Sequence, residues 1–69
     1  MPVKPRQFAK ALKKLGFEEV RQKGSHCIFA HNDGRYVIVP MHATDLKTGL
    51  YHGLLKQAGI TDAELRKLI

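Results

Sequence analysis

Residues 26–40 read HCIFAHNDGRYVIVP and carry the strongest structural signal in this chain. Two runs within them, residues 27–31 and 36–39, are rich in amino acids that favour β-strands. Asn32-Asp33-Gly34, which separates the two runs, has the composition of a tight turn. The stretch therefore predicts a β-hairpin, and Pro40 is expected to stop the pairing because proline has no backbone N–H to donate.

The length of the hairpin loop decides how two histidines are placed. With a two-residue loop at positions 33–34, His26 and His42 would lie on opposite sides of the sheet. With a three-residue loop at positions 32–34, His26 would face Pro40 and share a sheet face with His42. The second form is slightly favoured, since a glycine occupies the third loop position, where the backbone is left-handed. The sequence alone leaves both registers open.

The segment before the hairpin predicts a helix and then a strand. Pro5 suits the first turn of a helix, and Gly16 suits its end, so we expect a helix over about residues 5–15. Residues 17–23 form the expected strand, although apolar and polar residues alternate poorly there. The apolar stripe of the helix consists of Phe8, Leu12 and Leu15. The cations off this stripe, expected at the solvated surface, are Lys10, Lys13 and Lys14.

The segment after the hairpin predicts a second main helix and a short terminal one. Gly53 interrupts the second helix, and close packing against another backbone is the expected reason. Gly59 is expected to end that helix. Residues 61–64 have the spacing of a capping box and open the terminal helix. The residues proposed as N-caps of the second helix are Thr44, Asp45 and Thr48. Its expected apolar face consists of Leu50, Leu54, Leu55 and Ala58.

These elements predict an α+β fold in the order α-β-β-β-α, with a short C-terminal helix. A three-stranded antiparallel sheet with both main helices on one face buries each apolar stripe once and leaves the other sheet face open. The chain has 69 residues, which suffices for a single domain spanning residues 1–69. Its 43% hydrophobic and 26% charged residues are ordinary for a globular protein.

Composition also indicates which classes of partner the chain can bind and where in the cell it is expected. Twelve Lys and Arg oppose six Asp and Glu, a formal charge of +6 that favours polyanions such as nucleic acid. Tryptophan is absent and aromatic residues are few, which disfavours a broad base-stacking platform. No apolar stretch approaches the ~20 residues of a membrane span, and no signal peptide is evident. The chain has one cysteine and so cannot form an internal disulfide, which suits the reducing cytoplasm. We therefore expect a cytoplasmic location and, in the absence of an apolar span, no membrane partner.

Gly24-Ser25-His26, at the start of the hairpin, is the expected centre of chemistry. An imidazole exchanges protons near neutral pH, so His26 can act as a general base on a ribose 2′-hydroxyl without a metal. Arg21 and Lys23 are suited to hold the phosphate. Ser25 or a backbone N–H near Gly24 can donate to a phosphate oxygen. The best general acid for the leaving oxygen is His42, with a lysine or water as the reserve.

Other polar residues point to structural roles. The histidines and Cys27 lack paired zinc-ligand spacings, so no metal and no cofactor are expected. Cys27 lies in an apolar run and is expected to be a small buried residue. His31 is expected at a strand end, and His52 on a helix surface.

Residues 21–26 have the pattern Arg-x-Lys-Gly-Ser-His, and Pro-x-His follows downstream at residues 40–42. In these motifs, its most specific features, the chain resembles the HicA family of type II toxins. The resemblance implies a small double-stranded-RNA-binding-like fold, ribosome-independent cleavage of mRNA and neutralisation by a HicB antitoxin. It places the catalytic histidine at His26, its motif neighbours at Gly24 and Ser25, and a second recurrent histidine at His42. The segments that carry the resemblance are residues 15–17, 21–26, 39–42 and 54–60.

Two other functions fit the same charge and fold. A non-catalytic RNA-binding module would use Arg21 and Lys23 but not the imidazole of His26. A protein-interaction domain would bind one tight partner and show no salt-dependent RNA binding. Duplex-binding domains read shape, whereas an endonuclease of this kind acts on exposed single-stranded stretches of message.

Overall fold

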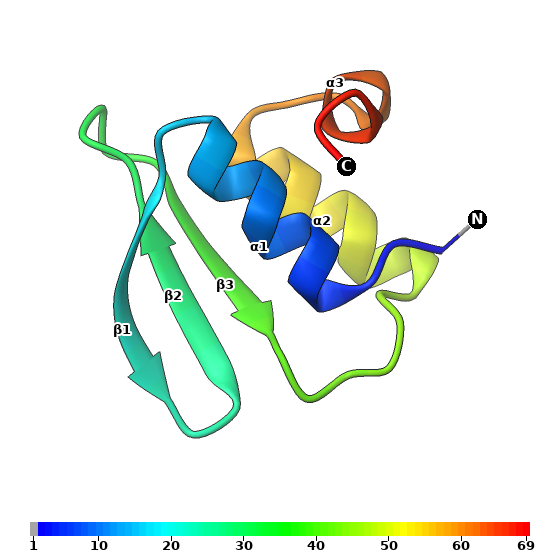
Figure 1. Ribbon diagram of the computed structural model, residues 1–69, viewed down its shortest axis with the longest axis horizontal. Coiled ribbons are helices and arrows are strands. Elements are labelled where there is room, and N and C mark those ends of the chain that lie inside the picture. The colour runs from blue at the N-terminus through cyan, green and yellow to red at the C-terminus, as the bar shows by residue number, and fades with distance from the viewer. Residues whose placement is uncertain (1) are drawn as a thin grey trace.

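The computed structural model describes residues 2–69, whose elements follow one another in the predicted order (Figure 1). The three strands form one antiparallel sheet in the order β1-β2-β3. This arrangement confirms the α+β prediction. None of the helices in the described part is long and apolar enough to cross a membrane. The elements are α1 Pro5–Lys14, β1 Glu18–Lys23, β2 His26–Ala30, β3 Tyr36–Pro40, α2 Thr48–Ala58 and α3 Asp62–Arg66.

The hairpin of β2 and β3 has the three-residue loop. The N–H of Gly34 donates to the carbonyl of His31 at 3.0 Å, and the N–H of His31 donates to the carbonyl of Arg35 at 2.9 Å. Gly34 has φ +99°, the left-handed backbone that this bulged loop requires. His26 pairs with Pro40 in the resulting register. Pro40 thus belongs to β3, whereas the sequence placed the end of the strand one residue earlier.

One face of the sheet forms the hydrophobic core with the helices. Alternation along the hairpin turns four side chains toward this core: Cys27, Phe29, Val37 and Val39. Phe8 and Leu12 of α1 and Leu54 of α2 are almost completely buried against them. The rings of Phe8 and Tyr51 meet edge-on with centroids 6.1 Å apart, which joins α1 to α2. The helices therefore share the buried sheet face, as predicted.

The start of α2 differs from the prediction. Lys47 is the N-cap residue and provides no side-chain cap, so Thr44, Asp45 and Thr48 are not the caps. The helix turns Tyr51 into the core, whereas Leu50 remains 43% exposed. The buried positions are Tyr51, Leu54, Leu55 and Ala58, a stripe of helical spacing that excludes Leu50.

The close approach of another backbone that was expected at Gly53 is not found, and Gly24 has open space around it as well. A Cβ added to Gly24 or to Gly53 would meet no atom within 4 Å. Gly24 has φ +60°, so a left-handed backbone is its physical requirement. Gly53 lies exposed within α2, and nothing in the described structure explains it. The predicted ends of the two main helices are confirmed, with Gly59 at φ +71° as the C-cap of α2.

Candidate active site

The turn between β1 and β2 places His26. Lys23 pairs with His26, which leaves Gly24 and Ser25 as the two turn residues. Gly24 has a positive φ, and positive φ occurs at no residue other than glycine among residues 2–69, so the turn has the type II′ pattern. The side-chain amide of Gln22 donates to the carbonyl of Gly24 at 3.2 Å and supports the turn. His26 is thereby held as the first, exposed residue of β2.

The chain that leaves β3 brings His42 beside His26. The N–H of Met41 donates to the carbonyl of Ser25 at 2.7 Å, which continues the β2–β3 ladder one residue past Pro40. The N–H of Ala43 then donates to the carbonyl of Pro40 at 3.3 Å, which closes a turn around His42. The two imidazole rings lie with centroids 5.9 Å apart and planes at 63°. The structure therefore brings the two predicted histidines together.

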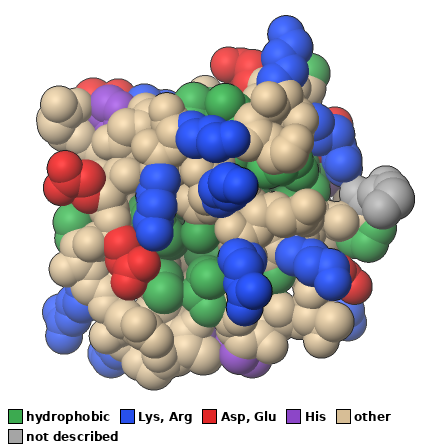
Figure 2. All heavy atoms as spheres, in the orientation of Figure 1, with side chains coloured by type: hydrophobic (Ala, Val, Ile, Leu, Met, Phe, Trp, Pro, Cys, Tyr) green, Lys and Arg blue, Asp and Glu red, His purple; other side chains and the backbone are tan. Residues whose placement is uncertain are grey.

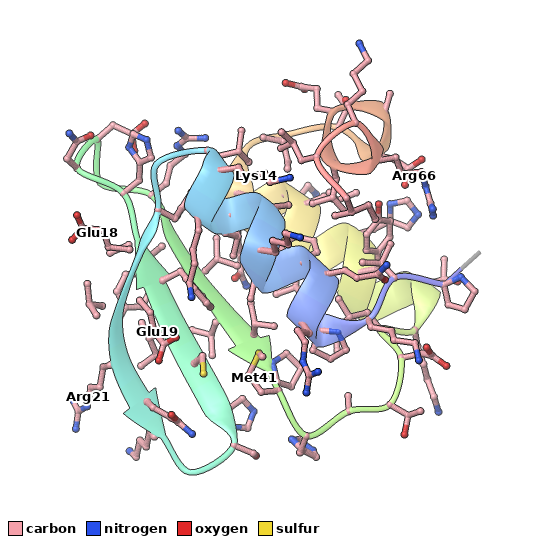
Figure 3. All side chains as sticks on the ribbon, viewed as in Figure 1. Lys14, Glu18, Glu19, Arg21, Met41 and Arg66 are labelled. Atoms are coloured by element: carbon pink, nitrogen blue, oxygen red, sulfur yellow. The ribbon has the colours of Figure 1, made fainter. Side chains whose placement is uncertain are left out.

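Two cations lie on the sheet face that carries His26. Lys23 is directly opposite His26, and Arg21 lies two residues before Lys23, so alternation puts all three on the face opposite the core. The pairing is irregular between Glu19 and Arg21, which leaves Val20 as an unpaired bulge residue. Figure 3 shows Arg21 projecting outward from β1. Both cations are exposed and can meet an incoming phosphate.

The histidine pair is free to exchange protons with a ligand. Within residues 2–69, neither His26 nor His42 forms a hydrogen bond or an ion pair with another side chain. Both side chains are exposed to solvent. Two adjacent imidazoles can divide the roles of proton acceptor and proton donor, since each carries two nitrogens that bind or release a proton.

Cys27 follows His26 in the sequence but faces the core. Its thiol is buried, and burial, followed by the nearby Glu19 carboxylate, raises the pKa of Cys27 above its ordinary value. A raised thiol pKa leaves little thiolate at neutral pH, and the thiolate is the nucleophilic form. Cys27 is therefore a packing residue, as predicted.

The site lies within the region matched by a known family. The family model described as HicA toxin of bacterial toxin-antitoxin matches residues 5–60. The chain belongs to the HicA toxin family. It is therefore the toxin of a toxin–antitoxin pair, and its partner is an antitoxin. A comparison with curated proteins finds no match.

The other two histidines of this HicA toxin lie away from the pair. His31 is half-buried against Phe17, edge-on with ring centroids 5.1 Å apart, and its Nδ1 accepts a hydrogen bond from the N–H of Asp33. His52 is exposed on α2. Their predicted places at a strand end and on a helix surface are confirmed. Among residues 2–69, no three His, Cys, Asp or Glu side chains gather as a metal-binding group.

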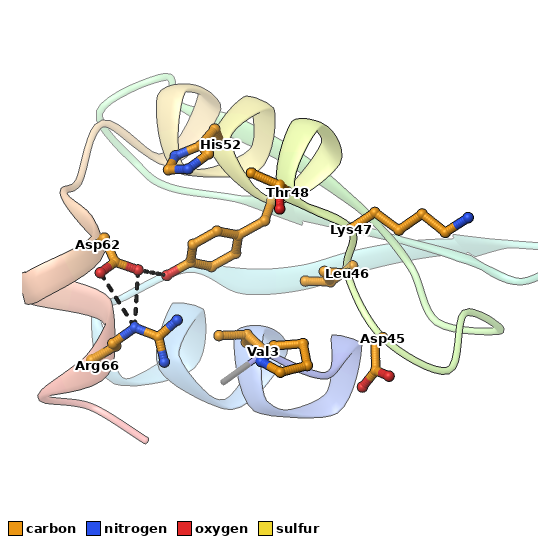
Figure 4. Close-up of a pocket in the computed structure, with 10 residues that line it drawn as sticks. Val3, Asp45, Leu46, Lys47, Thr48, His52, Asp62 and Arg66 are labelled. Carbon is orange, nitrogen blue, oxygen red and sulfur yellow. Dashed lines mark hydrogen bonds and ion pairs between the residues drawn. The ribbon is translucent and has the colours of Figure 1, made fainter.

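The HicA chain also has a hollow of about 560 Å³ between its N-terminal segment, α2 and α3 (Figure 4). Inside it, the hydroxyl of Tyr51 donates to Asp62, and Nε of Arg66 donates to the same carboxylate at 3.0 Å. Burial, together with Asp62, raises the pKa of Tyr51 to about 12, and the hydrogen bond from Tyr51 lowers the pKa of Asp62. The sequence reading missed this cluster, although Asp62 and Arg66 lie four residues apart on α3. The hydrogen bond from Tyr51 of α2 to Asp62 of α3 joins the two helices, so the cluster has a structural role.

Proposed function

We propose that this HicA toxin is a ribosome-independent mRNA endoribonuclease that uses the His26–His42 pair without a metal. The observation that carries the proposal is the 5.9 Å separation of these two exposed rings. Arg21 and Lys23 on the same sheet face supply the positive charge that a phosphodiester requires. A single-stranded message suits this reaction better than a duplex, since attack by the 2′-oxygen needs the leaving 5′-oxygen in line with it, and a flexible single strand can adopt that geometry.

The proposed reaction is an internal transfer at phosphorus. His26 removes the proton from a ribose 2′-hydroxyl, and the resulting oxygen bonds to the adjacent phosphorus. The bond from phosphorus to the 5′-oxygen of the next nucleotide breaks, and His42 gives that oxygen a proton. Lys23 and Arg21 neutralise the charge that develops on the phosphate oxygens. The products are a 2′,3′-cyclic phosphate and a 5′-hydroxyl, so no water and no metal enters this step.

The proposed antitoxin is a HicB-type protein that inhibits by covering the histidine pair. The exposed rings and the cations beside them form an open surface that a partner can occlude. An acidic partner surface would complement the formal charge of +6 and speed the encounter.

The test of this proposal is cleavage of RNA in the presence of EDTA by the wild-type chain and by His26→Ala. We expect the variant to cleave about 10²- to 10⁴-fold more slowly, since this is the usual contribution of a positioned general base. His52→Ala is the matched control, because His52 is equally exposed but lies on α2. Its cleavage rate should equal that of the wild type.

Three results would contradict the proposal. Equal cleavage by His26→Ala and the wild type would favour the non-catalytic RNA-binding alternative or a contaminating nuclease. A strict requirement for a divalent metal would exclude the proposed proton transfers as the sole chemistry. Products that end in a 3′-hydroxyl would exclude attack by the ribose 2′-oxygen.

A further inference from the structure

The exposed face of α1 has an unusual distribution of charge. The helix contains four cations and no Asp or Glu, and Lys4 immediately precedes it. The ion pairs that residues 2–69 form lie elsewhere, at Asp33 and Asp62. Figure 2 shows Lys and Arg side chains gathered over this part of the molecule. The four helical cations, all exposed, are Arg6, Lys10, Lys13 and Lys14.

This distribution opposes the stability of α1. Arg6 and Lys10 are one helical turn apart, as are Lys10 and Lys14, and like charges at this spacing destabilise a helix. Lys4 and Arg6 lie at the helix N-terminus, where the macrodipole already disfavours positive charge. A surface selected only for solubility would mix both signs. A local arrangement that costs stability is expected where function requires it.

Three of these cations, Lys4, Arg6 and Lys10, line a hollow beside the loop that carries His42. The hollow measures about 530 Å³ and lies between the first turns of α1 and the loop after β3. Met41 and Ala43, the chain neighbours of His42, form the loop side of the hollow. Figure 3 shows Met41 between β3 and α1. The α1 side is formed by Lys4, Pro5, Arg6, Gln7 and Lys10.

We propose that Lys4, Arg6 and Lys10 bind the sugar–phosphate backbone of the RNA strand next to the cleaved linkage. The inference rests on the proposed nuclease function and assigns the path of its substrate, from the His26–His42 pair across the loop and onto α1. A strand carries one phosphate per nucleotide, so Arg6 and Lys10, one helical turn of ~5.4 Å apart, can meet successive phosphates, and Lys4 lines the same hollow. Lys14 is not included, because its Nζ donates to the carbonyl of Leu68 at 2.9 Å.

The experiment compares two double variants with the same change in net charge. Arg6→Gln with Lys10→Gln removes the proposed contacts, whereas Lys56→Gln with Lys67→Gln removes two exposed cations that do not line the hollow. Affinity for a single-stranded RNA oligonucleotide is measured by fluorescence anisotropy at several salt concentrations. Both double variants also carry His26→Ala in this measurement, so that the RNA stays intact. Thermal melting by circular dichroism verifies that each variant is folded.

We expect the α1 variant to bind RNA about tenfold more weakly at physiological salt. Its salt slope should fall by about 1.4, since each phosphate contact to a single strand contributes about 0.7. The control variant should stay within about twofold of its parent. With His26 restored, the α1 variant should need more RNA for half-maximal cleavage yet reach the wild-type rate at saturation.

Equal weakening by both double variants would overturn the inference, because the effect would then follow net charge alone. Unchanged RNA affinity in the α1 variant would also overturn it, and a selective loss of antitoxin affinity would assign the face to the protein partner. These outcomes are separable from failure of the nuclease proposal. If RNA binding depends on α1 but no RNA is cleaved, the nuclease proposal fails and the binding path stands.

Discussion

The turn after β3 determines how His42 meets His26. The N–H of Met41 donates to the carbonyl of Ser25, so the β2–β3 ladder continues one residue past Pro40, which stands at a position that donates no hydrogen bond to β2. The chain then turns within two residues, which places the ring of His42 5.9 Å from the ring of His26. A backbone constraint thus fixes the separation of two exposed side chains.

His42→Ala tests the role proposed for the second imidazole. We expect cleavage to slow by about 10²- to 10⁴-fold, because the leaving 5′-oxygen loses its proton donor. RNA affinity should be unchanged, since the cations that hold phosphate remain. Wild-type cleavage by His42→Ala, or a loss confined to RNA affinity, would contradict the assignment.

The sequence identified His26 and His42 but not their separation. Residue types and the motif pointed to both, whereas their distance depends on whether the hairpin loop has two or three residues. Those two loops differ by one residue of register, and one residue moves a side chain to the other sheet face. The favoured three-residue loop is confirmed by the pairing of His26 with Pro40.

Gly24 in the β1–β2 turn and Gly53 in α2 differ in backbone conformation. Gly24 has φ +60° in the turn that presents His26, whereas Gly53 lies in an ordinary helical backbone with open space around it. Side-chain volume is therefore tolerated at both positions, but backbone conformation restricts only Gly24.

Alanine at each of these glycines should change stability in opposite directions. Gly24→Ala should lower the free energy of unfolding by about 1–2 kcal/mol, the usual cost of a left-handed backbone for an L-residue. Gly53→Ala should raise it by about 0.8–1.0 kcal/mol, because alanine favours the helix interior over glycine. Urea unfolding measures both changes. If both substitutions changed the free energy of unfolding equally, the positive φ of Gly24 would not be the reason for glycine at that position. RNA cleavage should decline only in Gly24→Ala.

Sequence patterns predicted the type and the buried face of single elements better than the residues at which those elements begin. The hairpin, the stripe of α1 and the capping box of Thr61 and Glu64 follow from local spacing and are confirmed. The cap of α2 was misplaced, since Thr44 and Asp45 before Lys47 and Thr48 after it all have good capping side chains and none of them caps the helix. The packing of Tyr51 against Phe8 determines which face of α2 is buried. Local helix propensity cannot predict this contact, because it joins two separate helices.

Across the whole chain, charge and apolar packing are separated by face. The core joins one sheet face to both main helices, while Arg21, Lys23 and His26 occupy the opposite face. Element order and net charge could be read from the sequence because they depend on local spacing and counting. The contact of Tyr51 with Asp62 could not, since it joins residues of two helices whose relative placement only the fold defines.

Asp62 links the stability of the whole chain to pH. Hydrogen bonds from Tyr51 and Arg66 hold the pKa of Asp62 below its unfolded value of about 3.9, so the folded chain favours the ionised carboxylate. A depressed pKa contributes stability that is present above about pH 4 and is lost as pH falls through the lower folded value. The melting temperature should therefore fall on acidification.

Asp62→Asn should remove the part of this acid sensitivity that comes from Asp62. Its melting temperature should lie below that of the wild type between about pH 5 and 7, and the gap should narrow below about pH 4, where Asp62 in the wild type becomes protonated. Asp45→Asn is the matched control, because Asp45 is an exposed carboxylate in the same hollow that makes no hydrogen bond within residues 2–69. Its melting curve should follow the wild type at every pH. A constant gap for Asp62→Asn down to pH 2 would show that the carboxylate stabilises α3 by packing alone, since packing does not depend on its proton.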